Sequence, residues 1–75
     1  MMHYLTEQQI GEMAMAVLST IEFTPTSHQR QIEIAVEHSI DEWGIKPNHS
    51  AALLAVKKAN LGWQAIQNLT KEIIQ

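Results

Sequence analysis

Histidine is the residue type in this chain best suited to metal binding or to proton transfer near neutral pH. The four histidines are His3, His28, His38 and His49, and their spacing never gives the His-x-x-x-His pair of a helical zinc site. A zinc ion needs at least three converging ligands, and the chain contains no cysteine to supply thiolates. We therefore expect no metal and no cofactor, and we interpret the histidines as exposed or partly packed residues.

Serine and threonine hydroxyls are the other groups that could supply chemistry, as nucleophiles. Those near the expected helix starts and turns are Thr6, Thr24, Thr26, Ser27 and Ser50. Helix capping accounts for such positions without a catalytic role. The chain has no Gly-x-Ser-x-Gly motif, and three isolated glycines cannot form a phosphate-binding loop. We therefore predict that the protein is not an enzyme and has no catalytic residues.

The length and composition predict one small globular domain, residues 1–75. The chain is 45% hydrophobic and 17% charged, which is ordinary for a folded protein. Its net charge of −3 disfavours nonspecific nucleic-acid binding, which relies on a basic surface. The sequence has neither a signal-peptide pattern at its start nor an apolar run of about 18 residues. We expect a cytoplasmic protein that does not enter a membrane.

The small size also predicts self-association. A domain of this length buries a limited share of its surface, and small domains commonly rely on a disulfide, a metal or a partner chain. Disulfides are excluded here because cysteine is absent. We therefore expect a homo-oligomer, with a dimer as the first choice.

Hydrophobic periodicity predicts an all-α fold of three helices, at about 7–22, 28–43 and 49–74. The first helix begins with Thr6 and Gln9, which form a capping-box pattern. Its predicted buried face is Ile10, Met13, Ala14, Val17, Leu18 and Ile21. The predicted buried face of the second helix is Ile32, Ala35, Val36, Ser39, Ile40 and Trp43. Each set follows helical spacing, so each helix should bury one side.

Proline and glycine mark the two connections. Pro25 ends the first helix, and either Thr24 or Ser27 should cap the second. We expect Phe23 to fold back onto the core at this corner. Gly44 occupies the position that typically follows a helix end, and Pro47 prevents continuation. Either Asn48 or Ser50 should cap the third helix.

The third helix is the longest and the most apolar element. Its predicted inner seam is Val56, Ala59, Trp63, Ile66, Thr70 and Ile73. Leu53, Leu54 and Leu61 lie off this seam, so the first half of the helix is apolar over a wide arc. We expect a second copy to cover that first half, and the second half to pack as an ordinary amphipathic helix.

The leading functional hypothesis is a protein-interaction module that acts as a homo-oligomer on a protein partner. Glu33, Glu37 and Asp41 form an acidic stripe at a spacing of four, which would suit a basic partner, and Ile34 lies off the core face. Small acidic helical proteins of this kind are common among phage and mobile-element regulators or inhibitors of host factors. The candidate contact residues are Glu33, Ile34, Glu37, Asp41, Leu53, Leu54 and Leu61.

The first alternative is a helix-turn-helix DNA-binding regulator. The second and third helices, with the turn at Gly44, have the outline of that motif. Asn48, His49, Ser50 and Lys57 would then lead the recognition helix into the major groove. The few basic residues and the long turn containing Pro47 argue against this nucleic-acid hypothesis.

The second alternative is an oligomer that binds a small ligand such as a nucleotide. Lys57, Lys58 and Trp63 offer cations and a stacking surface. Over residues 61–66 the sequence resembles helical phage proteins that sequester signalling nucleotides. The resemblance covers six residues and assigns no site.

Overall fold

Residues 5–74 fold into three α-helices. A computed structural model describes residues 5–74, with side-chain positions over residues 5–71. The helices are α1 (Glu7–Phe23), α2 (His28–Trp43) and α3 (His49–Ile74). The all-α prediction is confirmed, and the predicted helix boundaries agree to within one residue. Of the four histidines, His3 lies outside the described residues.

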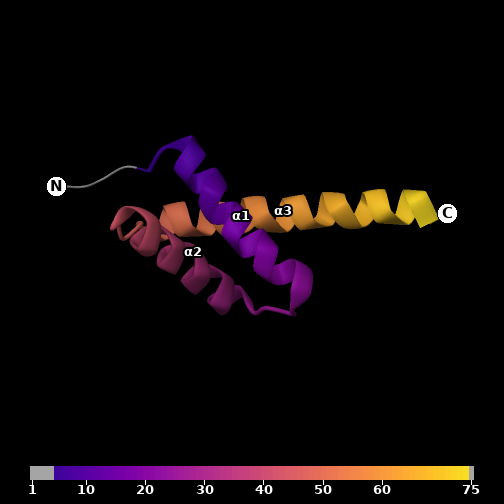
Figure 1. The fold of residues 1–75 in the computed structure, drawn as a ribbon, viewed down its shortest axis with the longest axis horizontal. Coiled ribbons are helices and arrows are strands. Elements are labelled where there is room, and N and C mark those ends of the chain that lie inside the picture. Colours follow the sequence, from indigo (N-terminus) through magenta and orange to yellow (C-terminus); the bar gives the residue numbers. More distant parts are fainter. Residues whose placement is uncertain (1–4, 75) are drawn as a thin grey trace.

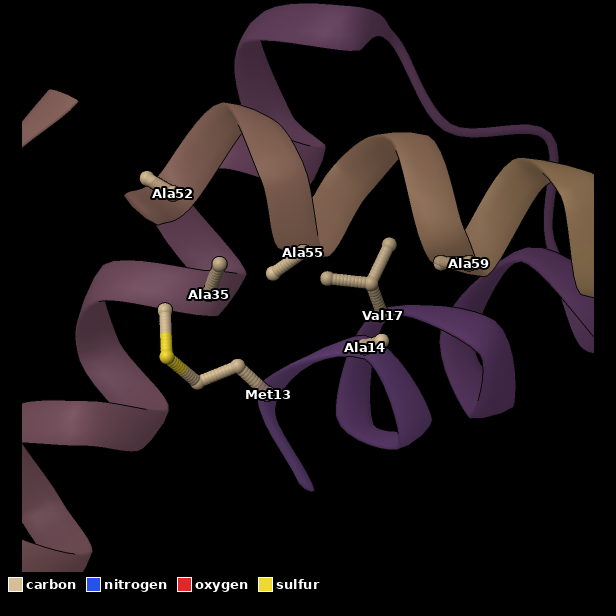
Figure 2. Close-up of a cluster of buried hydrophobic side chains, with 7 residues drawn as sticks. All are labelled: Met13, Ala14, Val17, Ala35, Ala52, Ala55 and Ala59. Atoms are coloured by element: carbon tan, nitrogen blue, oxygen red, sulfur yellow. The ribbon is translucent and has the colours of Figure 1, made fainter. Parts of the chain in front are cut away.

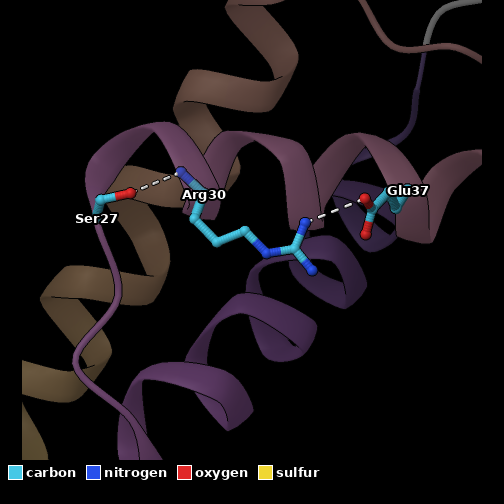
Figure 3. Close-up of polar contacts among 3 residues, drawn as sticks. All are labelled: Ser27, Arg30 and Glu37. Atoms are coloured by element: carbon cyan, nitrogen blue, oxygen red, sulfur yellow. Dashed lines mark hydrogen bonds and ion pairs between the residues drawn. The ribbon is translucent and has the colours of Figure 1, made fainter.

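Side-chain caps set the starts of α1 and α2. The backbone N–H of Gln9 donates to Thr6 Oγ1 at 3.1 Å, and the N–H of Thr6 donates to Gln9 Oε1 at 2.9 Å. This reciprocal pair is the predicted capping box. Ser27 caps α2, because its Oγ accepts from the backbone N–H of Arg30 at 3.1 Å (Figure 3). The alternative cap, Thr24, is instead the C-cap that follows α1.

The connection between α2 and α3 is a tight turn closed by hydrogen bonds. Gly44 adopts a left-handed conformation with φ of 66°, which glycine tolerates best. The buried hydroxyl of Ser39 donates to the carbonyl of Ile45 at 2.6 Å. Asn48 then caps α3, with its Oδ1 accepting from the N–H of Ala51 at 2.8 Å. This side chain satisfies one of the free donors at the helix start.

The helices α1 and α2 cover only the first half of α3 (Figure 1). At 1.5 Å per residue, the 26 residues of α3 span about 39 Å, whereas the 17 and 16 residues of α1 and α2 span about 24–26 Å. The second half of α3 therefore projects beyond the body. Every residue from 64 to 71 is exposed, and we call this segment the α3 extension.

The core is built mainly from small side chains (Figure 2). Its buried members are Met13, Ala14, Val17, Ala35, Ala52, Ala55 and Ala59. Alanine allows the three backbones to approach closely, but each buried methyl group contributes only about 0.8 kcal/mol. The largest fully buried side chains are Met13, Val17 and Ser39. Larger apolar side chains, among them Ile10, Leu18 and Trp43, pack against this core and are only partly buried.

The predicted buried face is confirmed for α1, and for α2 it is confirmed except at Ile40. All six predicted positions of α1 are buried or half-buried. On α2 the buried line is Gln31, Ala35 and Ser39, whereas Ile40 is 46% exposed. Gln31 can be buried because its amide nitrogen donates to the carbonyl of Thr26 at 3.0 Å. The buried face of α2 thus also includes a polar residue that hydrophobic spacing does not reveal.

Two further expectations are wrong. Phe23 does not fold back: as the last residue of α1 it stays in the helix and is 84% exposed. The second half of α3 does not pack inside the chain, because α1 and α2 are too short to reach it. The inner seam is buried at Val56 and Ala59, half-buried at Trp63 and exposed at Ile66 and Thr70, and the Ile73 side chain lies outside the described residues.

Candidate protein-interaction surfaces

Large apolar side chains remain exposed on all three helices. They are Met15, Phe23, Ile40, Leu54, Leu61, Ile66 and Leu69. Isolated exposed apolar residues are normal, whereas aligned ones mark binding surfaces. Two candidate surfaces follow: an alignment along the outside of α3, and a groove between α1 and α2 that is lined by Met15.

The first candidate surface runs along the solvent side of α3. Leu54, Leu61, Ala65 and Leu69 are all exposed, and their spacings of seven, four and four residues keep them on one side of the helix. We call these four residues the outer stripe. Leu54 is 41% exposed and Leu61 is 57% exposed. The stripe lies away from the buried line of Ala52, Ala55 and Ala59, which fill the core.

Two lysines border the outer stripe. Lys57 and Lys58 are exposed, and they lie between Leu54 and Leu61 in the sequence. Consecutive helix positions differ by about 100° around the axis, so the two ammonium groups fall on opposite sides of the stripe. The outside of α3 is therefore an apolar line with a cation on each flank.

The second candidate surface is a groove between α1 and α2. Its volume is about 350 Å³, and we call it the α1–α2 groove. The lining residues are Glu12, Met15, Ala16, Ser19, His38, Glu42 and Trp43. Those numbered 12 to 19 belong to α1 and those numbered 38 to 43 to α2, so each helix forms one wall. Sequence reasoning missed this site, because the groove exists only once the two helices pack.

The lining of the groove combines apolar side chains with a carboxylate from each helix. Met15 is 63% exposed, and a flexible thioether adapts to varied apolar partners. The rings of His38 and Trp43 meet edge to face with their centroids 5.5 Å apart. Glu12 and Glu42 are exposed carboxylates on opposite walls. The groove therefore suits a ligand that is apolar in the middle and cationic at its edges.

The predicted acidic stripe lies on another side of α2. Glu33, Glu37 and Asp41 are all exposed, and none of them lines the groove. The guanidinium of Arg30 donates to Glu37 Oε1 at 3.1 Å, which neutralises part of the stripe (Figure 3). An exposed pair of this kind contributes at most about 1 kcal/mol. The stripe keeps two carboxylates that lack an ion pair among residues 5–71.

The other candidate contact residues differ in exposure. Leu53 is half-buried, whereas Leu54 and Leu61 belong to the exposed outer stripe. Ile34 is partly buried and packs against the core cluster. Its spacing of four from His38 places both residues on the same side of α2. Ile34 therefore lies nearer the groove wall than the acidic stripe does.

The residues of the DNA-binding alternative are exposed at the start of α3. Asn48, His49 and Ser50 precede or form the first turn, and Lys57 lies two turns further on. The Oδ1 atom of Asn48 already accepts a hydrogen bond as the helix cap. Asn48 therefore serves the fold itself, which leaves fewer side-chain atoms free for reading bases.

The residues of the nucleotide-binding alternative do not converge. Lys57 and Lys58 are exposed on the outside of α3, whereas Trp63 is half-buried on its inner side.

Within residues 5–71, no three His, Asp or Glu side chains lie close enough to hold a metal ion. Among the described helices, none is both long and apolar enough to cross a membrane. Comparison with protein families, with curated proteins and with solved structures gave no match.

Proposed function

We propose that this protein is a non-enzymatic protein-interaction module that works as a homo-oligomer. The observation that supports this proposal is the outer stripe of α3. Leu54, Leu61 and Leu69 are aligned, exposed and continuous with a helix extension that α1 and α2 do not cover. Covering these aligned side chains with another protein surface removes apolar area from water, which favours association.

The small core supports the same proposal. The fully buried cluster holds five alanines beside Met13 and Val17, and the larger apolar residues packed against it are only partly buried, as is common in a chain of this size. Association adds buried apolar area without lengthening the chain. The oligomer would then present its remaining exposed surfaces to a protein partner, as a regulator or inhibitor does when it occupies a binding surface.

The native mass in solution tests the proposal. Light scattering behind size exclusion should give a mass above that of one chain, rising with protein concentration. Leu61→Glu should reduce it to one chain, because a carboxylate in the stripe would be buried without a partner. Gln67→Glu is the matched control, since Gln67 is exposed on another side of the same helix, and this variant should keep the wild-type mass.

Circular dichroism of both variants must show the wild-type helix content, so that a change of mass reports association rather than unfolding. A wild-type chain that stays monomeric up to millimolar concentration would contradict the homo-oligomer. Equal masses for Leu61→Glu and the wild type would place the contact away from the outer stripe.

A further inference from the structure

The two exposed apolar surfaces have opposite charge. The walls of the α1–α2 groove carry Glu12 and Glu42, whereas the outer stripe of α3 is flanked by Lys57 and Lys58. Among side chains 5–71, none of these four charges forms an ion pair within the chain. The acidic walls of the groove and the basic flanks of the outer stripe are therefore complementary in charge.

The opposite charges extend to whole helices. Together α1 and α2 carry seven carboxylates and one guanidinium, which leaves six net negative charges. The sequence of α3 contains three lysines and one glutamate, which leaves two net positive charges. Such a separation of charge favours the approach of α3 of one molecule to α1 and α2 of another, and it orients the encounter.

From these observations we infer that the α1–α2 groove binds the outer stripe of α3 from a second copy of the chain. Leu54 and Leu61 would enter the groove against Met15 and the Trp43 ring. Because Lys57 and Lys58 lie on opposite sides of the stripe, one ammonium group would face each acidic wall. This is the helix-in-groove mode of recognition, and it rests on the proposed function because it names the surfaces of the proposed oligomer.

The surfaces also match in length and chemistry. Leu54 and Leu61 are separated by about two helical turns, or about 10 Å. On α1, the groove wall from Glu12 to Ser19 has the same seven-residue length. Exposed Phe23 lies one turn further along this wall, where it would meet the end of a helix that continues past the groove. The contact would thereby cover exposed apolar residues of both copies at once.

The contact is heterologous, because the groove and the stripe are different surfaces. One contact gives a dimer with a free groove and a free stripe. Further contacts extend it into a ring or an open chain, depending on the rotation between copies. Charge-swap variants can test this arrangement, because each surface can be altered separately.

The test uses two variants whose changed residues are all exposed. Variant one, Glu12→Lys with Glu42→Lys, makes the groove basic and keeps the basic stripe. Variant two, Lys57→Glu with Lys58→Glu, makes the stripe acidic and keeps the acidic groove. Each should be monomeric alone, because its two surfaces now repel. An equimolar mixture should recover a mass above one chain, because both heterologous pairings are again complementary.

Controls with the same charge change separate the contact from the net charge. Glu33→Lys with Asp41→Lys alters the outer side of α2, and Arg30→Glu with Lys46→Glu alters the start of α2 and the turn after it, so neither control changes the groove lining or α3. Both controls should keep the wild-type mass. The inference is overturned if either groove or stripe variant alone keeps the wild-type mass, or if the mixture stays monomeric. If the wild type is oligomeric, those outcomes contradict the groove–stripe contact but not the proposed function. A monomeric wild type contradicts both the contact and the proposed function.

Discussion

The side-chain amide of Asn60 donates a hydrogen bond of 2.8 Å to Oε1 of Gln31, which joins α3 to α2. Gln31 is only 7% exposed, and its amide nitrogen donates to the carbonyl of Thr26. Asn60 also donates to the carbonyl of Val56 at 2.7 Å, which orients its amide toward α2. Both ends of a buried side chain are thus satisfied, so the pair fixes how the two helices align.

Removing Asn60 should destabilise the protein through Gln31. In Asn60→Ala the buried Oε1 atom of Gln31 loses its partner, which costs about 1–3 kcal/mol. Asn68→Ala is the matched control, because Asn68 is exposed on the same helix and the change in helix propensity is identical. Urea denaturation should show Asn60→Ala to be the less stable variant by that amount. Equal midpoints for the two variants would show that the Gln31 bond contributes nothing.

Two glycines should respond in opposite directions to the same substitution. A Cβ atom at Gly62 would lie 3.7 Å from Leu18 Cδ2, an ordinary contact, so Gly62→Ala should stabilise the helix by about 0.5–1 kcal/mol. Gly44→Ala should destabilise by about 1–2 kcal/mol, because its φ of 66° is unfavourable for alanine. Thermal unfolding followed by circular dichroism measures both shifts. A lower melting temperature for Gly62→Ala would indicate that Gly62 is needed for close contact with another chain.

Substitutions at two methionines of α1 distinguish the contribution of core packing from that of surface contact. Met13 is fully buried, so Met13→Ala should lower the free energy of unfolding by about 2–5 kcal/mol. Met15 is 63% exposed, so Met15→Ala should change it by about 0.5 kcal/mol or less. Urea denaturation at a concentration where the chain is monomeric gives both values. A large loss of stability in the Met15 variant would mean that the groove is already filled within one chain.

The helices could be predicted from sequence because their signals are local. Thr6, Pro25 and Gly44 determine where segments begin and end through backbone geometry and nearby hydrogen bonds. Periodic apolar residues then identify the buried face of α1 correctly. The same reasoning failed at Gln31, because a polar residue becomes buried only when a second helix supplies Asn60. That pairing spans 29 residues of sequence and has no local pattern.

The candidate surfaces were only partly predictable, for a related reason. The outer stripe was indicated by Leu54 and Leu61, which do not fit the inner seam. The groove was not, because Glu12 and Glu42 are brought together by the packing of α1 against α2. The exposure of the α3 extension depends on the difference in length between α3 and its two neighbours. Periodicity shows which side of α3 faces the core but not how far the core extends along it, so it placed Trp63 and Ile66 equally on a buried seam.

The helical order of the α3 extension should depend on association. A helical segment of fewer than about 12–15 residues that packs against nothing is marginal in water. Residues 64–71 are all exposed, whereas the segment 52–59 contributes Ala52, Ala55 and Ala59 to the core. In a dilute monomer we therefore expect backbone amides of the extension to exchange hydrogen much faster than those of residues 52–59.

Hydrogen exchange read by mass spectrometry at increasing protein concentration measures this dependence. If a second copy covers the outer stripe, Leu69 is buried with it and exchange over residues 64–71 slows as the oligomer forms. The Leu61→Glu variant should remain monomeric, so its extension should exchange rapidly at every concentration. Slow exchange of the extension in the monomeric variant would show that the helix is stable alone, and its order would then give no information about a partner.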